Sequence, residues 1–392
     1  MAAMLLLILI YLSYVCLGIQ GSLLGAAWPA MYSSLSLPVS FIGTLSLVIT
    51  GSTIISSIFC EKALKRLNTG MVIGTGFLMI VAALSGLSIS NGSIMLCLFS
   101  IPLGLGIGLE EVALNDFIAR HYKAKHMNWL HCFWGGGATI GPVILAFCLM
   151  HIGSWNSGYL VIGAVMACFV VCVFLSLPLW KNFTGTQAKE AGASPSKFSQ
   201  LLKIPRVKYA LALFFIYTGF EAVIILWGSS YLSIVKNISA ETAAYWMAVF
   251  FFGLTFGRFV SGFLTLKLNS RLIIHLGLTV IAVGGTLLFM STASALLQIS
   301  FFMLGLGCAP VFPTLAYETP ANFGMEHSQA IMGLEIAFAY SGAALMPLLF
   351  GGIASKWGYE ILPVFIGFML IIVTILVENL HKKIEKVSCV LN

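Results

Sequence analysis

The chain has 392 residues, of which 59% are hydrophobic and only 8% are charged, with a net charge of +7. Soluble domains carry about 25% charged residues, so this composition excludes a soluble globular protein and indicates a polytopic membrane protein. The nine cysteines are scattered through apolar runs and form no CxxC or other metal-binding spacing. We therefore expect free thiols, no metal site and no cofactor.

Apolar runs between polar or Gly/Pro-rich breaks predict twelve membrane-spanning helices, because one span needs about 20 apolar residues. The expected spans are 4–32, 39–59, 71–90, 93–118, 128–151, 157–180, 207–234, 240–265, 271–291, 293–317, 327–352 and 358–380. Pro310 and Pro313 predict a break in the tenth span. The longest polar stretch, 181–206, predicts a linker between an N-terminal half, 1–180, and a C-terminal half, 207–392.

Lys and Arg residues are distributed unevenly among the predicted loops. If both termini lie inside, the inner segments hold most of these cations, and the outer loops hold only Lys236 and Lys356. Cytoplasmic loops of membrane proteins are enriched in Lys and Arg. We therefore expect a multi-pass protein of the cell membrane with both termini in the cytoplasm. This asymmetry also accounts for the net positive charge, so we do not expect nucleic acid as a partner.

Short patterns recur in the two predicted halves at a nearly constant shift of 201 to 205 positions. The matching segments are 65–69 with 266–270, 104–106 with 305–307, and 137–142 with 342–347. Two parallel six-helix repeats around a central cavity are typical of one large class of transporters.

Five stretches carry polar or small residues inside the predicted spans. They are GIGLEEVALN at 106–115, NWLHCFWGGGATIGP at 128–142, YTGFEAVIILWGSSYL at 217–232, FFFGLTFGRFVSG at 250–262 and GLGCAPVFPTLA at 305–316. The chain resembles the major facilitator superfamily, and within it the fucose–galactose–glucose:proton symporter branch. It departs from the superfamily signature at Lys65, where an Asp is usual, and from the branch pattern near Gly25, where the first span lacks the usual Asp.

The resemblance implies an all-α membrane protein with the major facilitator fold, twelve transmembrane helices in two six-helix halves. It implies secondary active transport by alternating access, with Glu111 as the acid of the fourth span and Asn115 four residues later. It also places His131 and Trp134 among the sugar-binding groups of the fifth span.

Acids inside the predicted spans are the candidates for proton or ion coupling. Such residues are costly in a membrane and usually face a cavity or a partner. Glu111 and Asn115 share one helix face, whereas Glu110 points about 100° away. We expect one of the two acids to face a cavity and favour Glu111; Glu221 in the seventh span is a third candidate. The alternative for each acid is a structural pairing with a neighbouring helix.

Aromatic and polar side chains in the spans are candidates for substrate binding, because a ring can cover the apolar face of a sugar while polar groups fix its hydroxyls. The expected substrate-binding residues are Gln20, Trp28, Asn115, Asn128, His131, Trp134, Tyr217, Trp227, Glu335 and Tyr340. The alternative for the Trp and Tyr residues is a place in the interfacial aromatic belts. Asp116, Arg120 and Arg258 are expected to form gating or helix-end salt bridges.

No ATP-binding, GxSxG or HExxH motif occurs in the sequence, so we expect no enzyme and an energy source in an ion or substrate gradient. The leading hypothesis is proton-coupled symport of a monosaccharide or related small polar solute by a monomer in the bilayer. A sodium-coupled sugar transporter, an exporter of drugs or other metabolites, and a nutrient sensor without transport are the alternatives.

Overall fold

The computed structural model describes residues 2–122, 124–181, 201–204, 206–265, 267–291, 293–323 and 325–391. Within these ranges it leaves undescribed the side chains of 2, 3, 61, 65, 119, 120, 124, 125, 127, 128, 181, 325–330 and 382–391. The regular structure of the described residues is helical, and twelve helical segments are long and apolar enough to cross a membrane. The prediction of twelve spans is confirmed. The predicted linker, 181–206, lies mostly outside the described residues.

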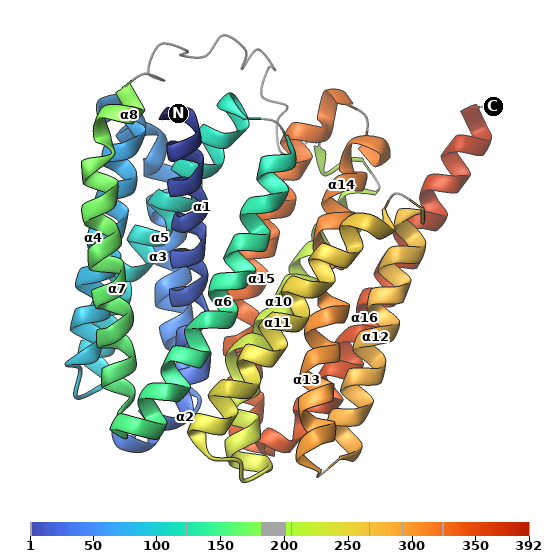
Figure 1. The fold of residues 1–392 in the computed structure, drawn as a ribbon. Coiled ribbons are helices and arrows are strands. Elements are labelled where there is room, and N and C mark those ends of the chain that lie inside the picture. The colour runs from blue at the N-terminus through green and yellow to red at the C-terminus, as the bar shows by residue number, and fades with distance from the viewer. Residues whose placement is uncertain are drawn as a thin grey trace. The chain divides into compact units, whose positions relative to one another are not determined.

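The chain divides into two compact units, and the first contains Met1–Ala188 with Gly228–Ala248. Its helices are α1 (Ala2–Gly21), α2 (Leu23–Ser34), α3 (Phe41–Arg66), α4 (Thr69–Ser88), α5 (Ser93–His121), α6 (Ala124–Ile152), α7 (Trp155–Leu175) and α8 (Leu177–Lys181). Helix α5 packs against α3 and α4, α1 packs against α6, and α4 packs against α7 (Figure 1). The first span is α1 followed by α2, with the interruption at Ser22.

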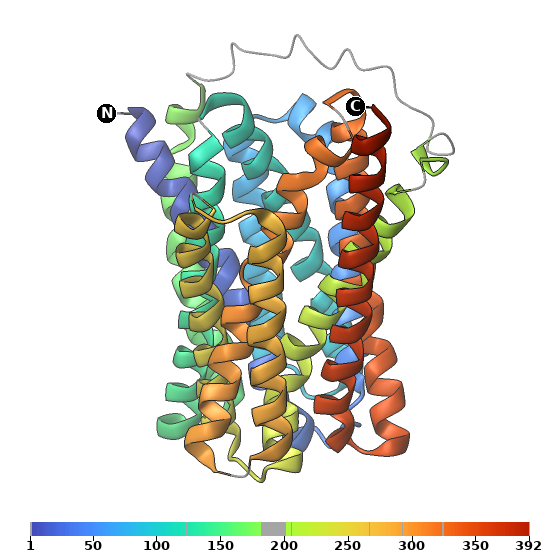
Figure 2. The ribbon, with the colours of Figure 1, turned by 90° about the vertical axis from the view of Figure 1, so that its right-hand side faces the viewer.

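The second unit contains Lys189–Trp227 and Val249–Asn392. The helices that lie wholly or partly in it are α10 (Val207–Val235), α11 (Ala240–Leu264), α12 (Ser270–Met290), α13 (Ser294–Cys308), α14 (Val311–Phe323), α15 (Met325–Trp357), the 3₁₀ helix η1 (Tyr359–Ile361) and α16 (Leu362–Leu391). Helix α12 packs against α13, α14 and α16 (Figure 2). The units divide α10 and α11, so the predicted boundaries of the two halves stay a prediction.

The tenth span is broken at Pro310, as predicted, whereas Pro313 lies inside the first turn of α14. Helix α13 ends at Cys308 and α14 begins at Val311, on either side of Pro310. Proline lacks the N–H that would continue the helical ladder. The Tyr217 hydroxyl donates a hydrogen bond of 2.7 Å to the carbonyl oxygen of Cys308, at the break. A side chain from α10 thus satisfies a main-chain acceptor where the helix is interrupted.

The sequence repeat reappears as repeated local structure at two helix starts. The Asn68 side chain accepts a hydrogen bond of 2.8 Å from the main-chain N–H of Met71, and Asn269 accepts one of 2.8 Å from Leu272. Each Asn is the N-cap of the next helix, α4 or α12. An N-cap side chain satisfies one of the N–H groups that the first helical turn leaves without a partner. The recurring Leu-Asn-Thr/Ser motif therefore has the same structural role in both units.

Close backbone contacts also recur in equivalent places. A Cβ atom added at Gly104 would overlap the carbonyl oxygen of Ile49, and one added at Gly305 would overlap that of Phe250. Both partners in this contact are shifted by 201 positions. The small residues therefore let two helices touch main chain to main chain, which is a common device in membrane helix packing.

Candidate functional site

Three helices of the first unit bring polar and aromatic side chains together. The Tyr14 hydroxyl of α1 donates a hydrogen bond of 2.6 Å to Oδ1 of Asn115 in α5. The His131 ring of α6 stands edge-on to the Tyr14 ring, with the centroids 6.2 Å apart. Tyr14 is buried, Asn115 is half-buried and His131 is exposed. We call Tyr14, Asn115 and His131 the α1–α5–α6 cluster.

The close approach of α1 to α6 has a clear origin in the sequence. A Cβ atom at Gly18 would overlap the carbonyl oxygen of Trp134, and one at Gly137 would overlap that of Val15. Because both positions are glycine, the two backbones can lie in contact. The Trp134 ring is half-buried and lies against Gly21, where an added Cβ would be 3.6 Å from its Cζ2 atom. The Trp134 ring, which was predicted to bind substrate, and the α1 backbone at Gly21 therefore lie side by side.

The two neighbouring glutamates of α5 have different surroundings. Glu110 is fully buried, and neither of its carboxyl oxygens has a hydrogen-bond partner. It packs against α4, where a Cβ atom at Gly76 would lie 2.7 Å from the Glu110 Cγ atom. Glu111 is half-buried. Both glutamates lie on α5 within five residues of Asn115, a member of the α1–α5–α6 cluster.

Two predicted aromatic residues are enclosed within their own units. The Trp28 indole N–H donates a hydrogen bond of 2.7 Å to the carbonyl oxygen of Val39. The Trp227 N–H donates one of 3.0 Å to the carbonyl oxygen of Pro347, and its ring stacks on Tyr359. Both tryptophans are fully buried. In this structure their indole groups anchor neighbouring main chain, and their substrate-binding role stays a prediction.

The second unit holds its own group of predicted residues. Glu221 of α10 is half-buried and interacts electrostatically with Arg258 of α11. Tyr217 lies one turn before Glu221 on α10, and its hydroxyl donates to the carbonyl oxygen of Cys308. The structure therefore brings Tyr217, Glu221 and Arg258 together around the break in the tenth span.

Glu335 of α15 has a direct partner in the second unit. Its Oε2 atom accepts a hydrogen bond of 2.7 Å from the Thr319 hydroxyl of α14. The carboxyl group is buried. Tyr340 lies further along α15 and is half-buried. Glu335 therefore links α14 to α15. This structural role is the alternative to substrate binding that the sequence leaves open.

The remaining predicted residues are Gln20, Asp116, Arg120 and Asn128. Gln20 is buried on α1, and Asp116 is half-buried on α5. The side chains of Arg120 and Asn128 lie outside the described residues, so the predicted Asp116–Arg120 pair and the Asn128 face stay predictions.

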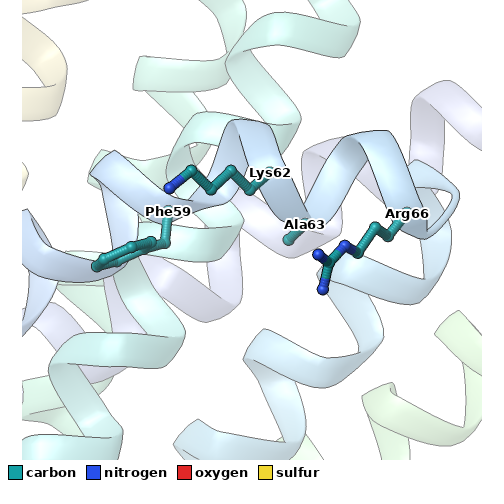
Figure 3. Close-up of a pocket in the computed structure, with 4 residues that line it drawn as sticks. All are labelled: Phe59, Lys62, Ala63 and Arg66. Carbon is teal, nitrogen blue, oxygen red and sulfur yellow. The ribbon is translucent and has the colours of Figure 1, made fainter.

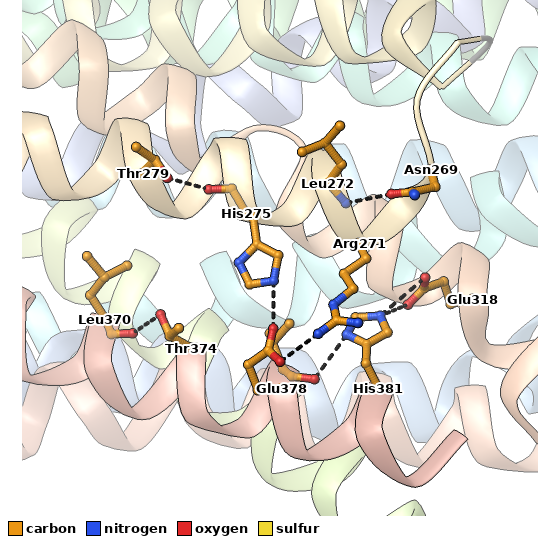
Figure 4. Close-up of polar contacts among 11 residues, drawn as sticks. Asn269, Arg271, Leu272, His275, Thr279, Glu318, Leu370, Thr374, Glu378 and His381 are labelled. Carbon is orange, nitrogen blue, oxygen red and sulfur yellow. Dashed lines mark hydrogen bonds and ion pairs between the residues drawn. The ribbon is translucent and has the colours of Figure 1, made fainter. Parts of the chain in front are cut away.

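Sequence reasoning missed a second polar cluster, formed by α12, α14 and α16 (Figure 4). Glu378 accepts hydrogen bonds from Arg271 at 2.7 Å and from His275 at 2.8 Å. The His381 ring lies 3.2 Å from an oxygen of Glu318. Charged residues near span ends are common and gave no signal for these pairings. No group of three or more His, Cys, Asp or Glu side chains suited to a metal ion occurs among the described residues.

Comparison with known proteins places this architecture in a family. The family model of the Major Facilitator Superfamily matches residues 10–264 and 209–384, so the chain belongs to that superfamily. It is 22% identical to Bypass of stop codon protein 6 of Saccharomyces cerevisiae (strain ATCC 204508 / S288c), over 92% of this chain and 79% of that protein. The superfamily assignment makes the chain a membrane transporter and not an enzyme.

Two solved structures share the fold. A mutant of the nucleoside transporter NupG superposes with a TM-score of 0.79 at 12% identity, covering 95% of this chain and 98% of that one. A bacterial homolog to the human lysosomal transporter Spinster, inward-facing and unoccupied, gives a TM-score of 0.74 at 14% identity and covers 98% of each chain. The all-α architecture predicted from the sequence, the major facilitator fold, is confirmed.

Proposed function

We propose that the chain is a secondary active transporter that moves a monosaccharide or a related small polar solute together with protons. The observation that carries this proposal is Glu110, a fully buried carboxyl group without a hydrogen-bond partner next to the α1–α5–α6 cluster. Acids inside membrane spans are by default functional candidates. The Glu111 carboxyl on the next position is the second coupling candidate.

Glu110 can link protonation to conformation for a simple electrostatic reason. A buried carboxylate without a partner is far more costly than a buried carboxylic acid. Proton binding therefore favours the enclosed arrangement of Glu110 against Gly76. Proton release favours an arrangement in which water or a partner reaches the acid. A transporter that alternates between two such arrangements would carry a proton in each cycle.

The α1–α5–α6 cluster supplies chemistry that suits a polyhydroxyl solute. Because the Asn115 oxygen accepts from Tyr14, the Asn115 amide nitrogen is left as a donor for a hydroxyl group. The exposed His131 ring is a second polar group beside it. Trp134, on the same helix as His131, offers an aromatic face. Such a mixture of a few polar groups and a ring is typical of small-molecule sites.

The test is uptake of a panel of radiolabelled hexoses into proteoliposomes, with and without an inward proton gradient. The parent, Glu110→Gln and Glu111→Gln are compared with Glu360→Gln, which removes an exposed carboxylate of η1. We expect gradient-stimulated hexose uptake in the parent and in Glu360→Gln. We expect the stimulation to be lost in Glu110→Gln, because an amide cannot bind and release the proton.

Three outcomes would count against parts of this proposal. Uptake that does not depend on the proton gradient but requires sodium would show that sodium, and not the proton, is the coupling ion. Full gradient stimulation in both Glu110→Gln and Glu111→Gln would show that neither acid takes part in coupling. Absence of hexose uptake by folded parent protein would reject the sugar and favour export or another solute.

A nucleoside is a second candidate substrate, because it combines hydroxyls with a flat base; the nucleoside transporter NupG shares the fold of this chain. Its ribose has hydroxyls for the α1–α5–α6 cluster, and its base has a flat face for Trp134. At 12% identity the similarity supports the fold and not the substrate. Radiolabelled uridine and adenosine in the same liposomes separate the two candidates.

A further inference from the structure

The end of α3 bears a cavity of about 460 Å³, and its described lining residues are Phe59, Lys62, Ala63 and Arg66 (Figure 3). The Lys62 side chain runs back along the helix, and its ammonium lies 5.2 Å from the centroid of the Phe59 ring. The Arg66 guanidinium lies beside Ala63 in Figure 3. Because Ala63 is small, space remains between the two cations. We call these four residues the α3 cavity.

The α3 cavity lies where the helix leaves the membrane. The apolar span is Phe41–Cys60, whereas the helix continues to Arg66. At 1.5 Å per residue, Arg66 is roughly 9 Å beyond the last apolar position, which is the depth of lipid headgroups. Ile55 and Ile58, which precede the cavity on α3, are exposed side chains inside the span. An exposed apolar surface therefore leads directly to the two cations.

The cavity is also electrostatically unbalanced. Segment 61–66 has three cations and one acid, Glu61, which gives a net charge of +2. Lys62 and Arg66 are exposed. Among the side chains that the structure describes, no ion pair joins a carboxylate to either residue. The cations therefore remain available to an anion from outside the chain.

We propose that the α3 cavity binds the headgroup phosphate of an anionic phospholipid in the adjoining leaflet. Arg66 presents a planar fork that matches phosphate oxygens, and Lys62 adds a point charge. The acyl chains lie along Ile55 and Ile58, which explains why a lipid and not free phosphate is the occupant. Under the predicted orientation this is the cytoplasmic leaflet, whose negative surface attracts basic segments next to spans.

The test is native mass spectrometry of the full chain in detergent, titrated with dioleoyl phosphatidylglycerol or dioleoyl phosphatidylcholine. The parent should retain phosphatidylglycerol, and the double variant Lys62→Gln/Arg66→Gln should bind it roughly 30-fold more weakly, because each cation contributes about a fivefold factor. The control Lys203→Gln/Lys208→Gln removes the same charge from two exposed lysines and should bind like the parent. Phosphatidylcholine binding should be equal in all three proteins.

Two further variants test the shape of the cavity and guard against a folding defect in the first. Ala63→Leu fills the cavity without changing the charge and should weaken phosphatidylglycerol binding about tenfold. The exchange Lys62→Arg/Arg66→Lys keeps both charges and should retain binding within about threefold. Equal retention of phosphatidylglycerol by the parent, the double variant and Ala63→Leu would overturn the proposal. So would equally tight binding of glycerol phosphate, which has no acyl chains.

Discussion

At the scale of single residues, Glu110 and Glu335 are both buried acids, but only one has a described partner. Glu110 has no hydrogen bond to either oxygen, whereas Glu335 accepts from Thr319 at 2.7 Å. An unsatisfied buried polar group lowers the free energy of unfolding by about 1–3 kcal/mol, and removal of one partner from a buried pair lowers it by a similar amount. The two acids should therefore respond in opposite ways to an apolar substitution of similar length.

We predict that Glu110→Met raises the melting temperature of the detergent-purified chain and abolishes proton-stimulated uptake. Glu335→Met should lower the melting temperature, because the Thr319 hydroxyl loses its acceptor. A thermal-shift scan of the two variants beside the parent measures both effects. A fall in melting temperature for Glu110→Met as large as that for Glu335→Met would show that Glu110 is a structural residue.

Tyr14 was not predicted from the sequence, and the structure gives it a positioning role. Its hydroxyl fixes the Asn115 amide through a hydrogen bond of 2.6 Å. We predict that Tyr14→Phe raises the KM for the transported solute by about 5- to 10-fold, the equivalent of one hydrogen bond of about 1 kcal/mol, and leaves the maximal rate within about twofold.

The matched control for this prediction is Tyr159→Phe. Tyr159 is also a buried tyrosine of the first unit, but its hydroxyl donates a hydrogen bond of 3.6 Å to the sulfur of Met31 rather than to an amide. Initial uptake rates over a range of solute concentrations separate KM from the maximal rate. An unchanged KM in Tyr14→Phe would show that Tyr14 does not position Asn115 for the solute.

At the scale of helices, the packing of α1 on α6 and of α10 on α15 depends on glycines at the contact. An alanine Cβ at Gly137 would overlap the Val15 carbonyl oxygen, and one at Gly342 would overlap that of Phe215. Main-chain atoms cannot move aside as a flexible side chain can. Overpacking of this kind typically costs about 1–3 kcal/mol and can cost more.

We predict that Gly137→Ala and Gly342→Ala each lower the melting temperature and the yield of monodisperse protein. Gly136→Ala is the control, because nothing lies within 4 Å of a Cβ atom at that position. It should leave stability equal or slightly higher, since Ala is a better helix former than Gly. Fluorescence-detected gel filtration after a heat step compares the three variants. Equal loss in Gly136→Ala would mean that helix propensity, and not close contact, decides the result.

At the scale of the whole molecule, the spans were predictable because the bilayer fixes their length and composition. The predicted span 39–59 corresponds to Phe41–Cys60, and 71–90 corresponds to Thr69–Ser88. The break at Pro310 follows from proline chemistry, and the superfamily follows from motifs within the spans. These features depend on local sequence, so a single sequence without an alignment is sufficient to predict them.

The arrangement of the candidate site was less predictable, because it depends on how each helix is rotated about its axis. Periodicity places Glu110 and Glu111 on different faces, but it does not show that Glu110 packs against Gly76. Likewise, nothing in the first span singles out Tyr14 as the partner of Asn115. The tryptophans show the same limit, since hydrogen bonds such as that from Trp28 to the Val39 carbonyl depend on the folded backbone.

The measurement that tests the central claim most directly is solute-driven proton movement. Proteoliposomes are prepared without any imposed gradient, and the external pH is recorded in weak buffer when the transported hexose is added. We predict that the external pH rises with the parent protein, because protons enter with the solute. With Glu110→Gln the hexose should equilibrate without a change in pH. Hexose entry through the parent without proton movement would contradict the proposed coupling.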